Sequence, residues 1–117
     1  MAKKVLVTCS GVSNTGKLTL QTAKAVMQRN PWIFEKHISA SDLNEECRDL
    51  LHDSVKVVVM DGCPDCCSCK KLKHLDVEPD VHIIATDHSI EKKGMDDPLF
   101  TDINALSEIL KKRIKTL

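Results

Sequence analysis

The sequence predicts an α/β protein, a three-layer αβα sandwich with a mostly parallel, Rossmann- or flavodoxin-like sheet of about four strands. Short β-branched runs alternate with longer segments whose apolar residues recur at helical spacing. This alternation is typical of a parallel sheet that is covered by helices on both faces. A length of 117 residues suits one domain with its own core, so we expect a single domain over residues 1–117.

The first half of the chain supplies the first strands and helix. Lys4–Cys9 is a short β-branched run that predicts a buried strand. Ser10–Gly16 is rich in Gly, Ser and Asn and predicts a loop. Helical spacing from Leu18 predicts a helix, which Asn30-Pro31 ends. Trp32–His37 is either a second short strand or a packed connection.

The second half repeats the alternation. Ser41-Asp42 predicts the start of a second helix, and Val55–Met60 is the clearest strand of the chain. Pro64 suits the first position of a third helix. Val81–Ala85 predicts another strand, and the last helix is expected to begin at about Thr101.

Composition and charge exclude several classes of partner. With 17 basic and 17 acidic residues the formal net charge is zero, which gives no broad surface for nucleic acid or anionic lipid. No apolar run approaches the roughly 18 residues of a membrane span. Met1–Lys4 leads directly into a short strand, and this arrangement lacks the core of a signal peptide. We therefore expect a cytoplasmic protein with no nucleic-acid or membrane partner.

The predicted topology brings distant residues together. The carboxyl ends of parallel strands meet at one edge of the sheet, where the working sites of such folds lie. Cys9 ends the first predicted strand, Asp61-Gly62-Cys63 follows the third, and Thr86-Asp87-His88 follows the fourth. We expect these three segments to lie at the same edge.

The cysteines are the main chemical signal. Four of the six lie between Cys63 and Cys69, too close together for a disulfide framework. In a reducing cytoplasm such clusters indicate metal binding or thiol chemistry. If Pro64 opens a helix, Cys63 is its N-cap and lies on the same face as Cys66 and Cys67, where the helix dipole favours thiolates.

The two remaining cysteines differ in how they relate to this cluster. Cys9 can reach it from the end of the neighbouring strand. Cys47 lies on an apolar helical stripe, and the residues alone favour a place in the core. Together the cysteines predict a thiolate metal site, with zinc as the preferred ion.

Other motifs give weaker indications. Gly11–Lys17 matches the phosphate-binding pattern G-x-x-x-x-G-K, but Leu18 stands where a Ser or Thr would bind magnesium, so nucleotide binding is a minor alternative. His82 alternates within a strand and is interpreted as structural. His88 is the one histidine placed at the expected edge, where it could act in acid–base chemistry or as an extra ligand.

The ordered motifs resemble a known family. They are Cys9-Ser10-Gly11, a mid-chain Cys47, Asp61-Gly62-Cys63-Pro64 with Cys67, and Thr86-Asp87 with Ile90-Glu91-Lys92. This set is similar to the DGC-domain family, small prokaryotic proteins described as zinc-binding, and the resemblance covers nearly the whole chain. It implies a four-cysteine zinc site formed by Cys9, Cys47, Cys63 and Cys67. It assigns no role to Cys66 or Cys69 and implies no reaction.

The role of a bound zinc depends on the number of its ligands, and two chemical alternatives to zinc stay open. A zinc ion with four thiolates has no open coordination position, which favours a structural or storage role, while a three-ligand site would leave room for catalysis. In a thiol or redox protein, the Cys63–Cys69 cluster would supply the nucleophile and a resolving thiol. Four thiolates also suit an iron–sulfur cluster. The residues do not decide whether the protein is an enzyme.

Overall fold

The computed structural model describes residues 3–52 and 55–117. The strands are β1 (Lys3–Thr8), β2 (Lys36–Ser39), β3 (Val55–Asp61) and β4 (Val81–Ile84). The helices are α1 (Asn14–Arg29), α2 (Glu45–His52), α3 (Cys67–His74) and α4 (Phe100–Ile114), with short 3-10 helices η1 (Ala40–Asp42) and η2 (Ala85–His88). The expectation about the N-terminus rests partly on Met1 and Ala2, which lie outside the described residues.

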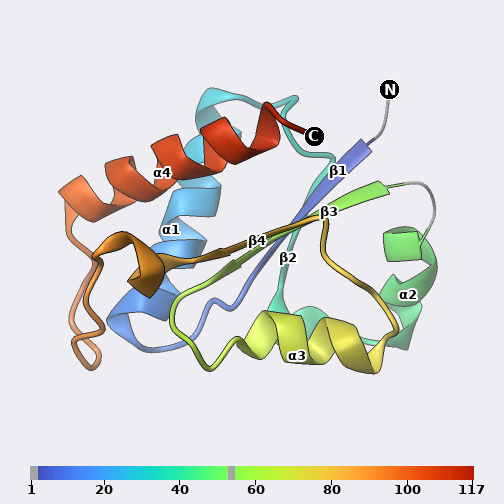
Figure 1. Ribbon diagram of the computed structural model, residues 1–117, viewed down its shortest axis with the longest axis horizontal. Helices are drawn as coiled ribbons and strands as arrows, with labels where there is room; N and C mark the ends of the chain where they lie inside the picture. The colour runs from blue at the N-terminus through green and yellow to red at the C-terminus, as the bar shows by residue number, and fades with distance from the viewer. Residues whose placement is uncertain (1–2, 53–54) are drawn as a thin grey trace.

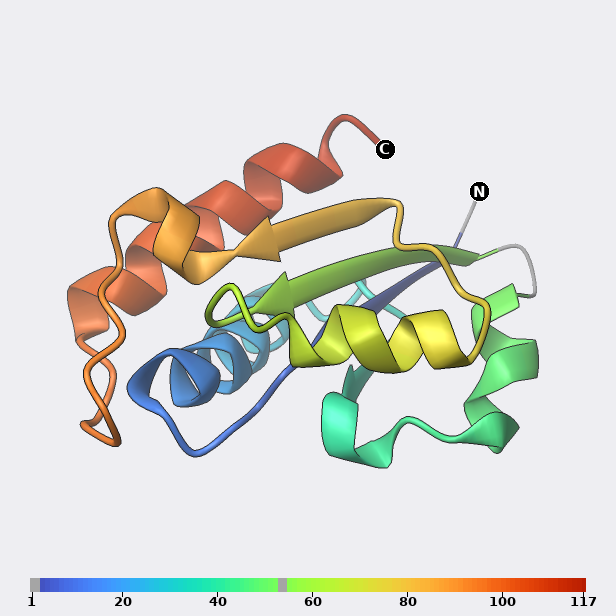
Figure 2. The same ribbon diagram turned by 60° about the horizontal axis from the view of Figure 1, so that its bottom comes forward.

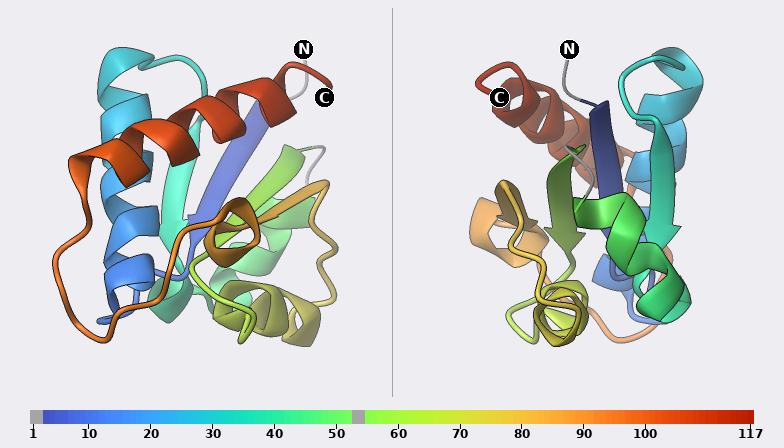
Figure 3. Two further views of the ribbon diagram at one scale, coloured as in Figure 1. Left: turned by 60° about the vertical axis from the view of Figure 1, so that its left-hand side comes forward. Right: turned by 90° about the vertical axis from the view of Figure 1, so that its right-hand side faces the viewer.

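The four strands form one parallel sheet in the order β2-β1-β3-β4. The arrowheads of β2 and β3 point the same way in Figure 3. This arrangement confirms the predicted α/β fold with a parallel sheet. The chain leaves β1 toward β2 on one side and leaves β3 toward β4 on the other. The centre of the sheet, between β1 and β3, is therefore the topological switch point, where ligands bind in folds of this kind.

Alternate side chains of the central strands face opposite helical layers, because successive residues of a strand point to opposite faces. Leu6, Val58 and Met60 are buried against α1 and α4. Val5, Val7, Val57 and Val59 are buried against α2 and α3. Figures 1 and 2 show the two pairs of helices on opposite sides of the strands. Burial of each such Val or Leu stabilises the fold by roughly 1.5–3 kcal/mol relative to exposure.

Two helices begin where polar side chains cap them, and not where the sequence pattern suggested. α1 begins at Asn14, inside the predicted loop, because Ser13 Oγ accepts a hydrogen bond from the Gly16 amide at 3.1 Å. α2 begins at Glu45 and not at Ser41. The side chain of Asn44 accepts hydrogen bonds from the amides of the second and third helical residues, at 3.0 and 3.3 Å.

The predicted start of α3 at Pro64 is wrong. The segment from Cys63 to Cys66 is a turn, closed by a hydrogen bond of 3.1 Å from the Cys66 amide to the Cys63 carbonyl. Cys66 is in the left-handed region with φ of 50°, so the helix starts only at Cys67. Cys63 is therefore not the N-cap, and the helix-dipole argument for its thiolate does not hold.

Two strand boundaries also differ from those expected. β2 covers Lys36–Ser39, so most of the predicted segment Trp32–His37 is a connection that enters the strand. β4 ends at Ile84, and Ala85 already belongs to η2. Within residues 3–52 and 55–117, no helix is both long enough and apolar enough to cross a membrane.

Candidate metal centre at the carboxyl edge of the sheet

Cys9 and the Gly62-Cys63 segment meet at the switch point. The Cys9 amide donates a hydrogen bond to the Met60 carbonyl at 3.2 Å and so continues the pairing of β1 with β3. The Gly62 amide donates to Cys9 Sγ at 3.3 Å. The predicted meeting of the first and third strand ends is confirmed, and the Cys9 sulfur contacts the residue that precedes Cys63.

The backbone behind this contact is packed too closely for side chains. A Cβ added to Gly62 would lie 2.6 Å from the carbonyl carbon of Thr15. One added to Gly16 would lie 2.7 Å from the amide nitrogen of Gly11. The loop after β3, the first turn of α1 and the loop after β1 therefore stack backbone against backbone. Glycine at positions 16 and 62 permits this stacking.

Cys63 lies beside a cation that comes from far along the chain. Lys92 Nζ is 3.6 Å from Cys63 Sγ and 3.7 Å from a carboxylate oxygen of Asp65. The negative charge of the Cys63 thiolate, followed by that of Asp65, raises the pKa of Lys92. The ammonium group thus stays charged at neutral pH and is placed to offset the negative charge of a thiolate site.

The other two predicted ligands lie on helices of one layer. Cys47 is in the first turn of α2, half-buried against the apolar cluster beneath it, and its Sγ is 3.7 Å from the Asp42 carbonyl oxygen. Cys67 is the first residue of α3 and is exposed. The structure thus brings Cys9 to the segment of Cys63. In the part of the chain that it describes, no three of the four predicted cysteine sulfurs lie within 4.8 Å of one another.

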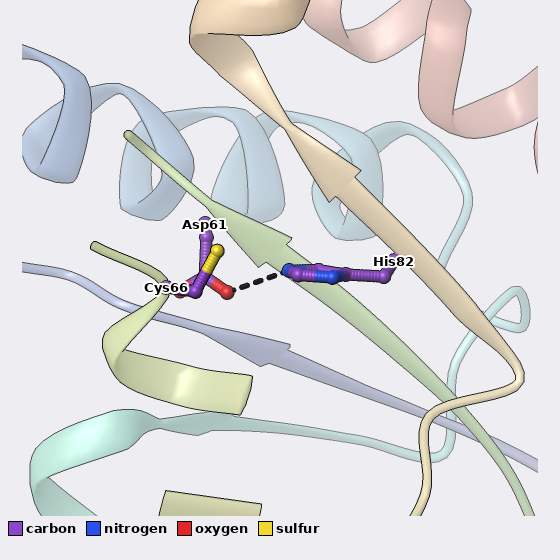
Figure 4. Close-up of side chains that lie close together, drawn as sticks. All are labelled: Asp61, Cys66 and His82. Carbon is purple, nitrogen blue, oxygen red and sulfur yellow. Dashed lines mark hydrogen bonds and ion pairs between the residues drawn. The ribbon is translucent and has the colours of Figure 1, made fainter. Parts of the chain in front are cut away.

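One group of potential ligands is already close together. One ligand atom each of Asp61, Cys66 and His82 lies within 4.8 Å of the other two. Figure 4 shows the three side chains close together. Asp61 is 1% exposed; its Oδ1 accepts a hydrogen bond from the Ser68 amide at 3.0 Å, and its Oδ2 lies 2.8 Å from His82 Nε2. Asp61 thereby caps α3, because the side chain of the N-cap residue, Cys66, makes no capping hydrogen bond.

The Cys66 thiol completes this group. Burial, followed by the nearby charge of Asp61, raises the pKa of the Cys66 thiol, so it keeps its proton at neutral pH in the absence of a metal. A carboxylate, an imidazole and a thiol are each known zinc donors, and a bound cation would displace the thiol proton. The three donors thus fit a divalent metal and leave a fourth position free.

Sequence reasoning missed this group. It interpreted His82 as structural, considered Cys66 only within the cysteine cluster, and placed Asp61 at the edge of the sheet without naming it as a ligand. A signal was present in the strand pattern, because Asp61 and His82 both follow the alternation that faces α3. Recognising it requires the register of β3 against β4, which the sequence alone does not give.

A second polar cluster lies on the opposite face of the sheet. Ser39 Oγ donates to Ser10 Oγ at 3.0 Å, Ser10 Oγ is 2.6 Å from Thr8 Oγ1, and Thr8 Oγ1 is 2.8 Å from His37 Nε2. Burial, and then the charge of Lys24, lowers the pKa of His37. The imidazole is therefore neutral at pH 7 and can take part in a chain of hydroxyl hydrogen bonds.

The Gly11–Lys17 loop is engaged by another segment of the chain. Lys17 Nζ donates to the Met95 carbonyl at 2.7 Å and lies 3.7 Å from Asp97. Asn14 binds the chain a few residues earlier, since its side chain donates to the Glu91 carbonyl at 2.8 Å. In this arrangement the lysine of the phosphate-binding pattern points to the segment 95–97. His88, at the end of η2, is exposed.

Comparison with known proteins gave one match. The family model described as the DGC domain matches residues 5–110, from within β1 to within α4. No curated protein and no solved structure matches the chain significantly. The match agrees with the resemblance inferred from the cysteine and glycine motifs.

Proposed function

Because the chain belongs to the DGC-domain family, we propose that it is a zinc-binding protein of the cytoplasm, with thiolate ligands at the carboxyl edge of its sheet. The proposed ligands are Cys9, Cys47, Cys63 and Cys67. The observation that carries the proposal is the contact of Cys9 Sγ with the Gly62 amide across the switch point, which places two chain-distant cysteine segments side by side.

The surroundings of these cysteines favour a bound thiolate. An N–H group that points at sulfur, as that of Gly62 does, stabilises its negative charge and orients it. Four thiolates around Zn²⁺ leave a net charge of about −2. The ammonium group of Lys92, at 3.6 Å from Cys63 Sγ, offsets part of that charge. In this proposal, Cys47 and Cys67, in the first turns of α2 and α3, would supply the remaining two thiolates.

A second ligand set has its own supporting observation. Asp61, Cys66 and His82 have their donor atoms within 4.8 Å of one another. Three protein ligands with a free fourth position are typical of zinc that activates water or a substrate. This set shares no residue with the four cysteines, so substitutions can separate the two.

The test is elemental analysis of untagged protein purified without oxygen. We expect about one zinc per chain in the wild type, as in tetrahedral structural sites. Cys9→Ser and Cys47→Ser remove ligands and should lose the metal. Cys69→Ser is the matched control from the same cysteine cluster and should keep it, as should His82→Gln. Circular dichroism checks that each variant is folded.

The alternative sites predict different metal contents for these variants. Metal retained in Cys47→Ser but lost in His82→Gln would assign the site to Asp61, Cys66 and His82. Iron and inorganic sulfide in place of zinc would indicate an iron–sulfur cluster. A metal-free wild type with all six cysteine thiols titratable would reject the metal-binding proposal.

A further inference from the structure

The turn before α3 holds two cysteines at its ends. Cys63-Pro64-Asp65-Cys66 is closed by the 3.1 Å hydrogen bond between the Cys66 amide and the Cys63 carbonyl. A turn of this kind keeps its first and fourth Cα atoms within roughly 7 Å, and proline is favoured at its second position. Disulfides join cysteines with Cα atoms about 4.4–6.8 Å apart. The turn therefore holds Cys63 and Cys66 at a spacing that a disulfide can bridge.

The side chains at this turn are placed for such a bond. Cys66 has a φ of 50°, and its Sγ is 3.9 Å from the Cys63 carbonyl oxygen, so it folds back over the turn. Both cysteines are free and half-buried, which leaves them accessible to a small molecule. Of the two, Cys66 is the sulfur that also lies within the Asp61–His82 group.

The two sulfurs have different neighbours. Lys92 Nζ lies 3.6 Å from Cys63 Sγ. The Cys66 sulfur lies within 4.8 Å of ligand atoms of Asp61 and His82. Thiol–disulfide exchange needs one attacking and one resolving sulfur. We assign the attack to Cys63, the sulfur beside the cation, and the resolving step to Cys66 at the other end of the turn.

We propose that Cys63 and Cys66 form a reversible dithiol–disulfide pair that exchanges with small-molecule disulfides such as oxidised glutathione. Cys63 sulfur attacks one glutathione sulfur, the S–S bond breaks, and the first glutathione thiol leaves with one proton. Cys66 sulfur then attacks Cys63 sulfur and releases the second glutathione with the other proton. Two cysteine thiols are oxidised, and one glutathione disulfide is reduced to two thiols.

This inference goes beyond the proposed zinc binding. Cys63 belongs to both the disulfide pair and the proposed ligand set, so oxidation of the turn and metal binding at Cys63 exclude each other. The disulfide itself needs no metal, because both sulfur atoms come from the ends of one hydrogen-bonded turn. Its test is therefore made on the same protein before and after treatment with a chelator, with zinc measured on both samples.

The experiment is incubation with oxidised glutathione, followed by thiol titration and mass-spectrometric mapping of disulfide-linked peptides. In chelator-treated wild type we expect the loss of two of the six thiols, a Cys63–Cys66 link, and full reversal by a dithiol reductant. Zinc-loaded protein should form the link more slowly. Cys66→Ser should instead retain glutathione on Cys63, because the resolving thiol is gone.

Cys69→Ser is the matched control. It should form the same link as the wild type, since Cys69 lies outside the turn. A Cys66–Cys69 link in the wild type, or mixed glutathione adducts without any internal link, would overturn the inference. Neither result bears on the proposed zinc binding, which elemental analysis of the same samples tests separately.

Discussion

At the scale of single residues, His37 shows how burial and hydrogen bonding set the protonation state of a side chain. Its Nε2 lies 2.8 Å from Thr8 Oγ1, and Thr8 is completely buried. A neutral ring can accept the Thr8 hydroxyl hydrogen, whereas a protonated ring cannot. Protonation would therefore reverse this hydrogen bond, so that the ring donates to Thr8 Oγ1 and the Thr8 hydroxyl hydrogen must turn toward another acceptor such as Ser10 Oγ.

This predicts that acid weakens the fold through His37. The pKa of His37 in the folded protein is lower than its ordinary value of 6.5, so the unfolded chain binds more protons between the two values. The free energy of unfolding contributed by this residue is complete above about pH 6.5 and falls as the pH decreases through the folded pKa. Urea unfolding between about pH 7.5 and about pH 5.5 measures the effect.

His37→Gln removes the titration while keeping a hydrogen-bonding side chain, so it should flatten this part of the pH dependence. His88→Gln, at an exposed histidine, should leave the wild-type slope intact. Equal slopes for wild type and His37→Gln would show that His37 is not responsible.

The residues that sequence reasoning identified and those it missed differ in a physical way. Cys9 and Cys63 were predicted at one edge because both follow strands, and parallel strands share that edge. The grouping of His82 and Cys66 was missed because it depends on tertiary contacts with Asp61. No local pattern distinguishes a histidine that meets a buried carboxylate from one that merely alternates in a strand.

At the scale of elements, the loop after β3 packs backbone against backbone with the first turn of α1. Gly62→Ala would place a methyl group 2.6 Å from a backbone carbon of Thr15, and neither backbone can yield without moving α1. We expect the free energy of unfolding to fall by about 1–3 kcal/mol, the usual cost of overpacking. Urea unfolding checks this.

Gly11→Ala is the matched control. It lies in the neighbouring loop, has no atom within 4 Å of the added Cβ, and should change the free energy of unfolding by less than about 0.5 kcal/mol. A Gly62→Ala variant as stable as Gly11→Ala would contradict the packing described for this edge. The same measurement would show that glycine in the Asp61-Gly62-Cys63 tripeptide serves no steric purpose.

The order of strands and helices was predictable from alternating patterns, but several boundaries were not. Pro64 is a sound helix-start signal in isolation. Here α3 begins only at Cys67, because Cys66 is in the left-handed conformation and Asp61 caps the helix at that point. Boundaries of this kind depend on contacts between elements, and such contacts appear only when the sheet is assembled.

At the scale of the whole molecule, the topology explains where the chemistry gathers. The order β2-β1-β3-β4 puts β1 and β3 at the switch point, and the edge they form carries Cys9, Cys63 and the Asp61 group. Helical layers on both faces bury the sheet and leave this edge as the place where loops converge. The parallel sheet was predictable from the sequence, whereas the distance of Cys47 from the edge depends on how α2 packs.

Zinc-edge X-ray absorption of the loaded protein measures directly whether four thiolates at this edge hold zinc. We expect a first shell of four sulfur atoms at about 2.3 Å, from Cys9, Cys47, Cys63 and Cys67. A first shell with one sulfur and with nitrogen or oxygen atoms at about 2.0–2.2 Å would contradict it and would place the metal at Asp61, Cys66 and His82.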